Sequence, residues 1–217
     1  MVVERLEVPG DKWALMSPGE EGSREVLVYL HGKCGDPDAF RAFLEAVPPR
    51  FTVLSLRGEI KCKDGVRTRW SGHVPSLDAR IAKAIAAASA LRRVPLRQDR
   101  RIVFGYSQGS LRAEALVARL PDRYPAAILA AAPRAPRDHA LDRAGAVVLL
   151  AGALDARGHL MKAAEELSRQ GLAVRYEELP EAHHGQYGPL ARETLAACFS
   201  WLQSHPPFND EGPAFQD

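Results

Sequence analysis

The chain has 217 residues, of which 46% are apolar and 26% charged, the ordinary composition of a globular domain. This length suits one α/β domain with a sizeable core. The formal net charge of +2 argues against a dedicated nucleic-acid binder. No apolar run reaches the roughly 18–20 residues of a membrane span. Residues 1–8 lack the apolar core of a signal peptide, so we expect a cytoplasmic protein.

Short apolar runs alternate with longer amphipathic segments along the chain. They predict strands over 26–30, 51–56, 101–106, 126–132, 146–151 and 173–179. Helices are expected from Pro37 through Leu44, from a cap at Ser76 to about Val94, and over 108–120, 160–170 and 190–203. Two extended segments, 2–8 and 12–16, precede this pattern and suit an antiparallel edge.

The strands are apolar throughout, which is typical of strands buried on both faces. Together with the β-α alternation, they predict a mostly parallel sheet flanked by helices, in one domain over 1–204. Residues 205–217 contain three prolines and little apolar pattern, so we expect a disordered tail there. The segment 133–145 is short, which predicts an open site without a substantial lid.

Gly105-Tyr106-Ser107-Gln108-Gly109 matches the motif G-x-S-x-G. It follows a β-branched apolar run and opens a helix, the strand–turn–helix setting in which this motif presents a nucleophile. Small residues at both ends let the strand and the helix pass closely, and the helix N-terminus favours developing negative charge. A plain serine N-cap between two packing glycines is the alternative.

Here the chain begins to resemble the α/β-hydrolases, which carry serine, acid and histidine in that order after successive strands. The stretch FGYSQGS resembles the carboxylesterase/lysophospholipase group of dienelactone-hydrolase-like serine esterases. Ser110 departs from that group, which usually has glycine at this position. The resemblance covers residues 26–201 and implies a single-domain α/β-hydrolase fold.

The acid and the histidine of the resemblance follow two later strands. Asp155 comes just after the strand at 146–151, where a carboxylate would orient the imidazole; a helix N-cap is the alternative, and Asp142 is a weaker candidate. His184 precedes Gly185 in the loop after the last strand and matches the family pattern better than His183 does. We therefore predict Ser107, Asp155 and His184 as the catalytic residues.

The turn His31-Gly32-Lys33-Cys34-Gly35 follows the first parallel strand. The resemblance implies that it supplies an oxyanion-hole N–H, from Lys33 or, in a shifted turn, from Cys34, with Gln108 N–H as the second donor. A structural glycine turn is the alternative.

Side chains near this turn are candidates for the pocket wall. Cys34 is a candidate substrate-lining residue, and Trp70 either lines the acyl pocket or anchors the core. The stretch 57–69 holds five basic residues against two acids, which either form a solvated loop or favour anionic esters. Cys34 and Cys62 follow neighbouring strands and are able to pair, but the composition favours two free thiols.

The expected activity is hydrolysis of a small-molecule carboxylic ester through an acyl-enzyme intermediate. It needs no cofactor, and the sequence has no His/Cys/Asp grouping with metal-ligand spacing. A thioesterase, an amidase or an acyltransferase would use the same three residues, and a non-catalytic binding protein is a further alternative. We expect no nucleic-acid partner and no membrane span.

Overall fold

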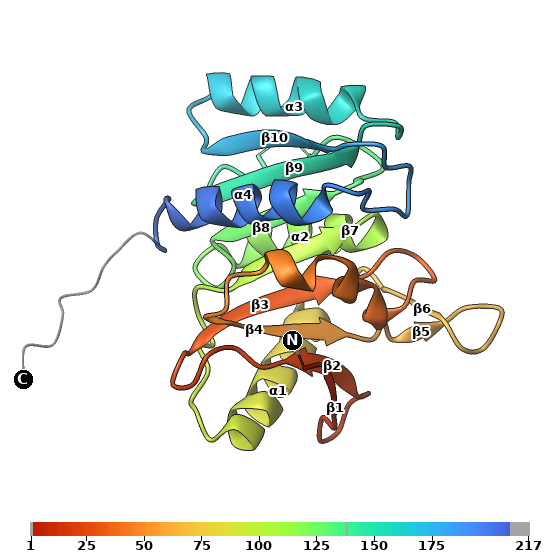
Figure 1. The fold of residues 1–217 in the computed structure, drawn as a ribbon, viewed down its shortest axis with the longest axis vertical. Helices are drawn as coiled ribbons and strands as arrows, with labels where there is room; N and C mark the ends of the chain where they lie inside the picture. The colour runs from red at the N-terminus through yellow and green to blue at the C-terminus, as the bar shows by residue number, and fades with distance from the viewer. Residues whose placement is uncertain (1, 138, 209–217) are drawn as a thin grey trace, which may run out of the picture.

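A computed structural model describes residues 2–137 and 139–208 of the chain. In this part the main sheet comprises β1 (Glu4–Leu6), β2 (Ala14–Ser17), β3 (Glu25–Leu30), β4 (Phe51–Leu56), β7 (Ile102–Tyr106), β8 (Ala126–Ala130), β9 (Ala146–Gly152) and β10 (Val174–Leu179). Their order across the sheet is β1-β2-β4-β3-β7-β8-β9-β10 (Figure 1). From β4 to β10 all neighbours are parallel, whereas β2 pairs antiparallel with both β1 and β4. The predicted parallel sheet and its antiparallel edge are confirmed.

Helices cover both faces of this sheet. The 3₁₀-helix η1 (Pro37–Ala46) and α4 (Ala191–Gln203) lie on the front face in Figure 1. The helices α1 (Val74–Arg92), α2 (Gln108–Arg119) and α3 (Gly158–Arg169) pack on the opposite face. Two apolar clusters lie between the sheet and the helices, one on each face of the sheet. The central strand residue Val28 belongs to one cluster and its neighbour Leu27 to the other. The apolar character of the strands therefore follows from burial on both faces.

Two helices differ from the predictions, the first in its type and the second in its start. The segment after Asp36 is a 3₁₀-helix, capped by the Asp36 carboxylate, which accepts the Asp38 N–H at 2.9 Å. Helix α1 begins at Val74 rather than after Ser76, because His73 Nδ1 caps it by accepting the Ser76 N–H at 3.3 Å. A histidine can fill this role, although serine, threonine, aspartate and asparagine are the residues that usually do so.

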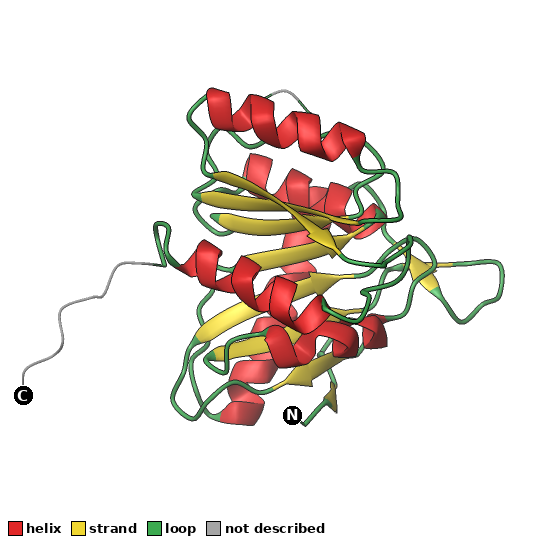
Figure 2. Cartoon of the chain, turned by 45° about the horizontal axis from the view of Figure 1, so that its top comes forward, coloured by secondary structure: helices red, strands yellow, loops and turns green. Residues whose placement is uncertain are grey.

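A small hairpin interrupts the predicted loop between β4 and α1. Its strands β5 (Ile60–Lys61) and β6 (Thr68–Arg69) are antiparallel and project from the carboxyl edge of the main sheet (Figure 2). The Asp64 carboxylate fixes the tip by accepting the N–H groups of Val66 and Arg67. Two-residue strands carry no periodicity, so the sequence pattern did not predict them.

The segment predicted to be a disordered tail is described only in part. Of the predicted tail, 209–217 lies outside the described residues, whereas 205–208 packs on the domain: Phe208 is buried, and Arg100 donates to the Pro207 carbonyl.

Between β8 and β9 the described residues form no helix or strand, in keeping with the absence of a substantial lid. The carboxyl ends of β3, β7, β9 and β10 share one open edge, where ligands bind in such sheets.

Candidate active site

Ser107 lies in the sharp turn between β7 and α2. Its backbone has φ 51° and ψ −112°, a strained combination for a residue with a side chain. The Ser107 N–H donates to the Ala130 carbonyl at 2.8 Å and so fixes the turn to β8. A Cβ at Gly105 would lie 2.3 Å from the Gly109 oxygen, and one at Gly109 would lie 1.9 Å from the Leu30 oxygen. Both positions therefore require glycine.

A chain of hydrogen bonds joins the three residues predicted to be catalytic. His184 Nε2 lies 3.2 Å from Ser107 Oγ, and His184 Nδ1 lies 2.8 Å from Asp155 Oδ2. Because a carboxylate only accepts, Nδ1 carries the proton and Nε2 is free to accept from the serine hydroxyl. The Asp155 side chain is 15% exposed and that of His184 is 52% exposed, so the imidazole is accessible from solvent. The arrangement is able to deprotonate Ser107.

The competing candidates lie outside this chain of hydrogen bonds. His183 is exposed, and its backbone N–H donates to Gln186 Oε1. Asp142 instead contacts His139 Nδ1 at 2.8 Å, on the loop before β9. Of the two adjacent histidines, the structure therefore brings His184 to the serine.

The loops that carry Asp155 and His184 are bound to each other. The Leu154 N–H donates to the Ala182 carbonyl at 3.0 Å, and the Ala153 N–H donates to Leu179 O at 2.9 Å. On the far side of the imidazole, the Gly185 N–H donates to the Tyr106 hydroxyl at 2.6 Å. The position of the histidine thus depends on the residue directly before the nucleophile.

The turn after β3 is held by the buried imidazole of His31. Its Nδ1 lies 2.7 Å from the Gly32 carbonyl and must donate to it, so Nε2 accepts the Gly58 N–H at 3.1 Å. Burial lowers the pKa of His31 and keeps the ring neutral, as this pattern of hydrogen bonds requires. Gly32 lies against the nucleophile, since a Cβ there would be 3.4 Å from Ser107 Cβ. The Lys33 N–H therefore follows directly on the residue that touches the serine.

Trp70 anchors the core and does not line the pocket, so its assignment as a substrate-lining residue is wrong. Only 2% of Trp70 is exposed, and its indole N–H donates to the His31 carbonyl at 2.7 Å. The Gln108 side-chain amide pairs with the Trp70 backbone, accepting its N–H at 3.1 Å and donating to its carbonyl at 3.3 Å. Trp70 thus connects the turn after β3 to the start of α2, the two backbone segments predicted to supply the oxyanion donors.

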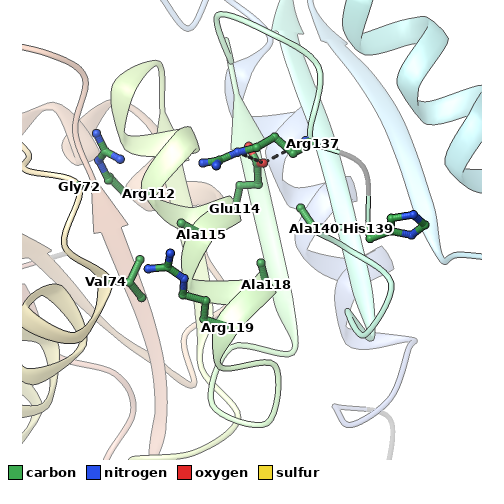
Figure 3. A pocket seen from close by; sticks show the side chains of 10 residues that line it. All are labelled: Gly72, Val74, Arg112, Glu114, Ala115, Ala118, Arg119, Arg137, His139 and Ala140. Atoms are coloured by element: carbon green, nitrogen blue, oxygen red, sulfur yellow. Dashed lines mark hydrogen bonds and ion pairs between the residues drawn. The ribbon is translucent and has the colours of Figure 1, made fainter.

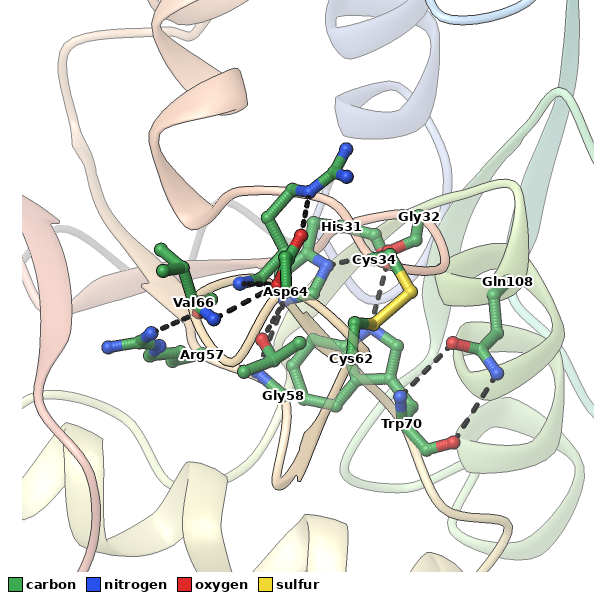
Figure 4. The surroundings of a disulfide bond; sticks show 12 residues. His31, Gly32, Cys34, Arg57, Gly58, Cys62, Asp64, Val66, Trp70 and Gln108 are labelled. Carbon is green, nitrogen blue, oxygen red and sulfur yellow. Dashed lines mark hydrogen bonds and ion pairs between the residues drawn. A yellow bond between two sulfur atoms is a disulfide. The ribbon is translucent and has the colours of Figure 1, made fainter.

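Cys34 and Cys62 form a disulfide, so the prediction of two free thiols is wrong (Figure 4). The bond joins the turn after β3 to the β5–β6 hairpin, and a β-bridge between Gly35 and Thr68 lies beside it. The hairpin brings the two cysteines to a Cα–Cα separation of 5.9 Å, within the range for pairing. Cys34 lies on the wall of a neighbouring cavity rather than in the pocket at Ser107.

A pocket of about 230 Å³ opens at Ser107. Three tyrosines enclose it, with Tyr29 and Tyr106 from strand ends and Tyr187 from the loop after β10. The hydroxyls of Tyr29 and Tyr187 lie 3.3 Å apart, and burial raises the pKa of both phenols, which keeps them neutral. The sequence pattern missed these residues, although Tyr106 occupies a variable position of the motif and Tyr29 is the second-last residue of the strand predicted over 26–30.

A cavity of about 420 Å³ lies beside α2 and contains none of the predicted site residues (Figure 3). Arg112 and Arg119 line it, and Glu114 binds Arg137 at its edge. Among the described residues, no group of three His, Cys, Asp or Glu side chains is placed to hold a metal ion. Within residues 2–137 and 139–208, no helix combines the length and apolar character needed to cross a membrane.

Solved structures show that the chain has the α/β-hydrolase fold. The Mesorhizobium loti carboxylesterase is 21% identical (TM-score 0.64), and the match covers 92% of this chain and 99% of that one. The Bacillus cereus carboxylesterase is 18% identical (TM-score 0.61), with coverages of 88% and 93%. A dienelactone hydrolase from Anabaena variabilis is 16% identical (TM-score 0.63), with coverages of 94% and 97%. No family model and no curated protein sequence matches the chain.

Proposed function

We propose that this chain is a serine hydrolase that cleaves carboxylic esters through an acyl-enzyme intermediate. The observation that carries the proposal is the continuous hydrogen-bonded chain from Asp155 through His184 to Ser107. The serine at its end has the strained backbone of a nucleophile turn at the N-terminus of a helix. A serine that served only as an N-cap would need neither the histidine nor the carboxylate.

In the proposed reaction, His184 Nε2 takes the hydroxyl proton of Ser107 as the oxygen attacks the ester carbonyl. Asp155 stabilises the imidazolium, which then protonates the leaving alcohol as the acyl-enzyme forms. Water, deprotonated by the same imidazole, releases the acid and restores Ser107. Each step uses a group of this chain or water.

The negative oxygen of the tetrahedral intermediate would bind two backbone N–H groups. Gln108 N–H is the first of α2, and Lys33 N–H lies in the turn that contacts Ser107. Neither N–H donates to another group in the part of the chain that the structure describes. Losing one such donor typically raises the barrier by about 3 kcal/mol. The Gln108–Trp70–His31 contacts would hold both donors in place.

The pocket volume of about 230 Å³ supports a short acyl group. Tyrosine side chains offer apolar faces to such a group and exclude water from it. A long fatty acyl chain would not fit, so we expect turnover to fall steeply as the chain lengthens.

Hydrolysis of p-nitrophenyl esters of graded acyl length tests the proposal, with Ser107→Ala measured beside the wild type. We expect turnover of the acetate and butyrate esters, and a loss of about 10⁴-fold or more in kcat for the variant. Ser200→Ala, at an exposed position of α4 that does not line the pocket, is the matched control and should keep wild-type turnover. Equal activity in wild type and Ser107→Ala would refute the proposal.

Further substrates with the same acyl group separate the other activities that these residues support. Thioesters and anilides with the same acyl group would be preferred over the oxygen ester by a thioesterase or an amidase. Product transfer to an added alcohol in preference to water would indicate an acyltransferase. A folded protein that turned over none of these substrates would point to a binding role.

A further inference from the structure

A second cavity lies beside the pocket at Ser107 and shares Lys33 with it. Its volume is about 650 Å³, and it lies between the turn after β3 and the β5–β6 hairpin. We call it the cationic basin; its walls are Lys33, Cys34, Lys61, Cys62, Lys63, Asp64, Arg67 and Arg69. The two cavities therefore adjoin at Lys33.

Positive charge in the basin is largely uncompensated. Its one carboxylate, Asp64, is already engaged by Arg67, whose Nε lies 2.5 Å from Oδ2. Within the described part of the chain, no ion pair involves Lys33, Lys61, Lys63 or Arg69.

Arg80, unlike these four side chains, has carboxylate partners. Arg80 pairs with both Asp11 and Glu59, and the whole chain carries a formal charge of only +2. Asp36, the acid at the rim of the pocket, caps η1. The excess of positive charge is therefore local to the basin.

The wall of the basin is fixed relative to the nucleophile. The Cys34–Cys62 disulfide and the Gly35–Thr68 bridge hold the hairpin against the turn that contacts Ser107. The Thr68 hydroxyl also lies 3.3 Å from His31 Nε2, inside the same turn. An anionic group would thus meet a preformed site and would not have to order a free loop.

We propose that the cationic basin binds an anionic group, a carboxylate or a phosphate, on the alcohol part of the ester substrate. This inference rests on the proposed function. The tyrosine side of the pocket receives the short acyl group at Ser107, and the alcohol extends past Lys33 toward Lys61, Lys63 and Arg69. The substrates are therefore short-chain acyl esters of hydroxy acids or of phosphorylated alcohols.

Paired substrates that differ in charge test this inference. The anionic probes are 3-acetoxybenzoate and 3-acetoxyphenyl phosphate, and the neutral probe is 3-acetoxybenzamide, with the same acyl group throughout. Each exposed cation–anion contact contributes about 1.5–5-fold to binding, so several together predict a kcat/KM ratio of about 10 or more in favour of an anionic probe. The preference should appear in KM and shrink toward 1 in 0.5 M NaCl, because salt screens exposed charges.

The variant Lys61→Gln/Lys63→Gln/Arg69→Gln should bring that ratio to within about threefold of 1. The ratio is insensitive to a general loss of activity, because both probes are measured on the same protein. Lys162→Gln, on the exposed face of α3, is the control with a charge change outside the basin and should keep the wild-type ratio.

The outcomes distinguish the two proposals. Turnover of charged and neutral probes with equal kcat/KM, or an anion preference that survives the triple substitution, would overturn the basin and leave the hydrolase proposal intact. A preference for the phosphate over the carboxylate probe, or the reverse, would identify which anion the basin binds. No turnover of any probe, together with no turnover of p-nitrophenyl esters, would instead refute the proposed function.

Discussion

At the scale of single residues, the candidate site depends on glycine at a position where the backbone leaves no room for a side chain. Ser107 adopts φ 51° because the chain turns sharply from strand β7 into helix α2, and the usual backbone conformations of a residue with a side chain do not produce this turn. Gly109 passes directly beneath the carbonyls of Leu30 and His31, so the start of α2 touches the end of β3. This close approach places the nucleophile beside the turn that is proposed to bind the oxyanion.

Gly109→Ala tests that dependence. The new Cβ would lie 1.9 Å from the Leu30 oxygen and 2.8 Å from the His31 oxygen, both of which are backbone atoms of a buried strand end. We expect the turn to shift, with a loss of stability of about 1–3 kcal/mol and at least about 100-fold lower kcat. Denaturant unfolding and ester hydrolysis measure the two effects. Wild-type kcat in a folded Gly109→Ala protein would contradict this account.

The sequence contained the candidate nucleophile in recognisable form, because G-x-S-x-G carries its steric reason in its glycines. The identities of the other site residues depended on side-chain direction, which spacing along the chain does not determine. His183 and His184 differ by one position, and only the folded loop turns one of them toward Ser107. Trp70 was ambiguous for the same reason, since a buried indole and a pocket wall have the same sequence pattern.

At the scale of elements, the β5–β6 hairpin is the part of the site with the least support from regular structure. Each of its strands has two residues, and its attachment depends on the disulfide, the Gly35–Thr68 bridge and the His31 ring. A hairpin of this size is not stable alone. The Cys34–Cys62 bond therefore supports both the turn after β3 and the wall of the cationic basin.

Cys34→Ser/Cys62→Ser should lower the free energy of unfolding by about 3–4 kcal/mol, because the bond closes a loop with a sequence separation of 28. Urea unfolding of wild type with and without a dithiol reductant measures this. Reductant should bring the wild type to the stability of the variant and leave the variant unchanged. Equal stability of oxidised wild type and variant would show that the bond does not support the fold.

The long elements were predictable and the short ones were not. Buried strands and amphipathic helices repeat a pattern over five or more residues, whereas the hairpin is defined by contacts with residues about 30 positions away in sequence. The order of the strands placed Cys34 and Cys62 within reach of each other, but the composition favoured free thiols, and the two short hairpin strands that align the pair have no sequence pattern. Disulfides persist in oxidising compartments, so this bond weighs against the cytoplasmic location expected from residues 1–8.

At the scale of the whole molecule, a buried ionic network joins the helix layer to the sheet. Asp78 of α1 accepts from Arg101 at 3.2 Å and from the Tyr124 hydroxyl at 2.7 Å, at the amino ends of β7 and β8. Arg101 is 1% exposed and also donates to Tyr124 at 2.6 Å. This network lies at the edge of the sheet opposite to the candidate site, so it bears on stability rather than on chemistry.

Asp78→Ala should therefore lower the free energy of unfolding by about 3–5 kcal/mol, because it leaves the buried Arg101 guanidinium without a carboxylate. Asp122→Ala removes a carboxylate from an exposed pair with Arg143 and should cost less than about 1 kcal/mol. Thermal and urea unfolding compare the two variants. A loss for Asp78→Ala no larger than that for Asp122→Ala would contradict the role of the network.

The central claim is that Ser107 is a nucleophile activated by His184 and Asp155. Its most direct test is a fluorophosphonate probe, with the modified residue identified by peptide mass spectrometry in the wild type and in His184→Ala. We expect a single adduct on Ser107 that forms at least about 100-fold more slowly in the variant. A folded wild-type protein that stays unlabelled, or that is labelled at another residue, would contradict it.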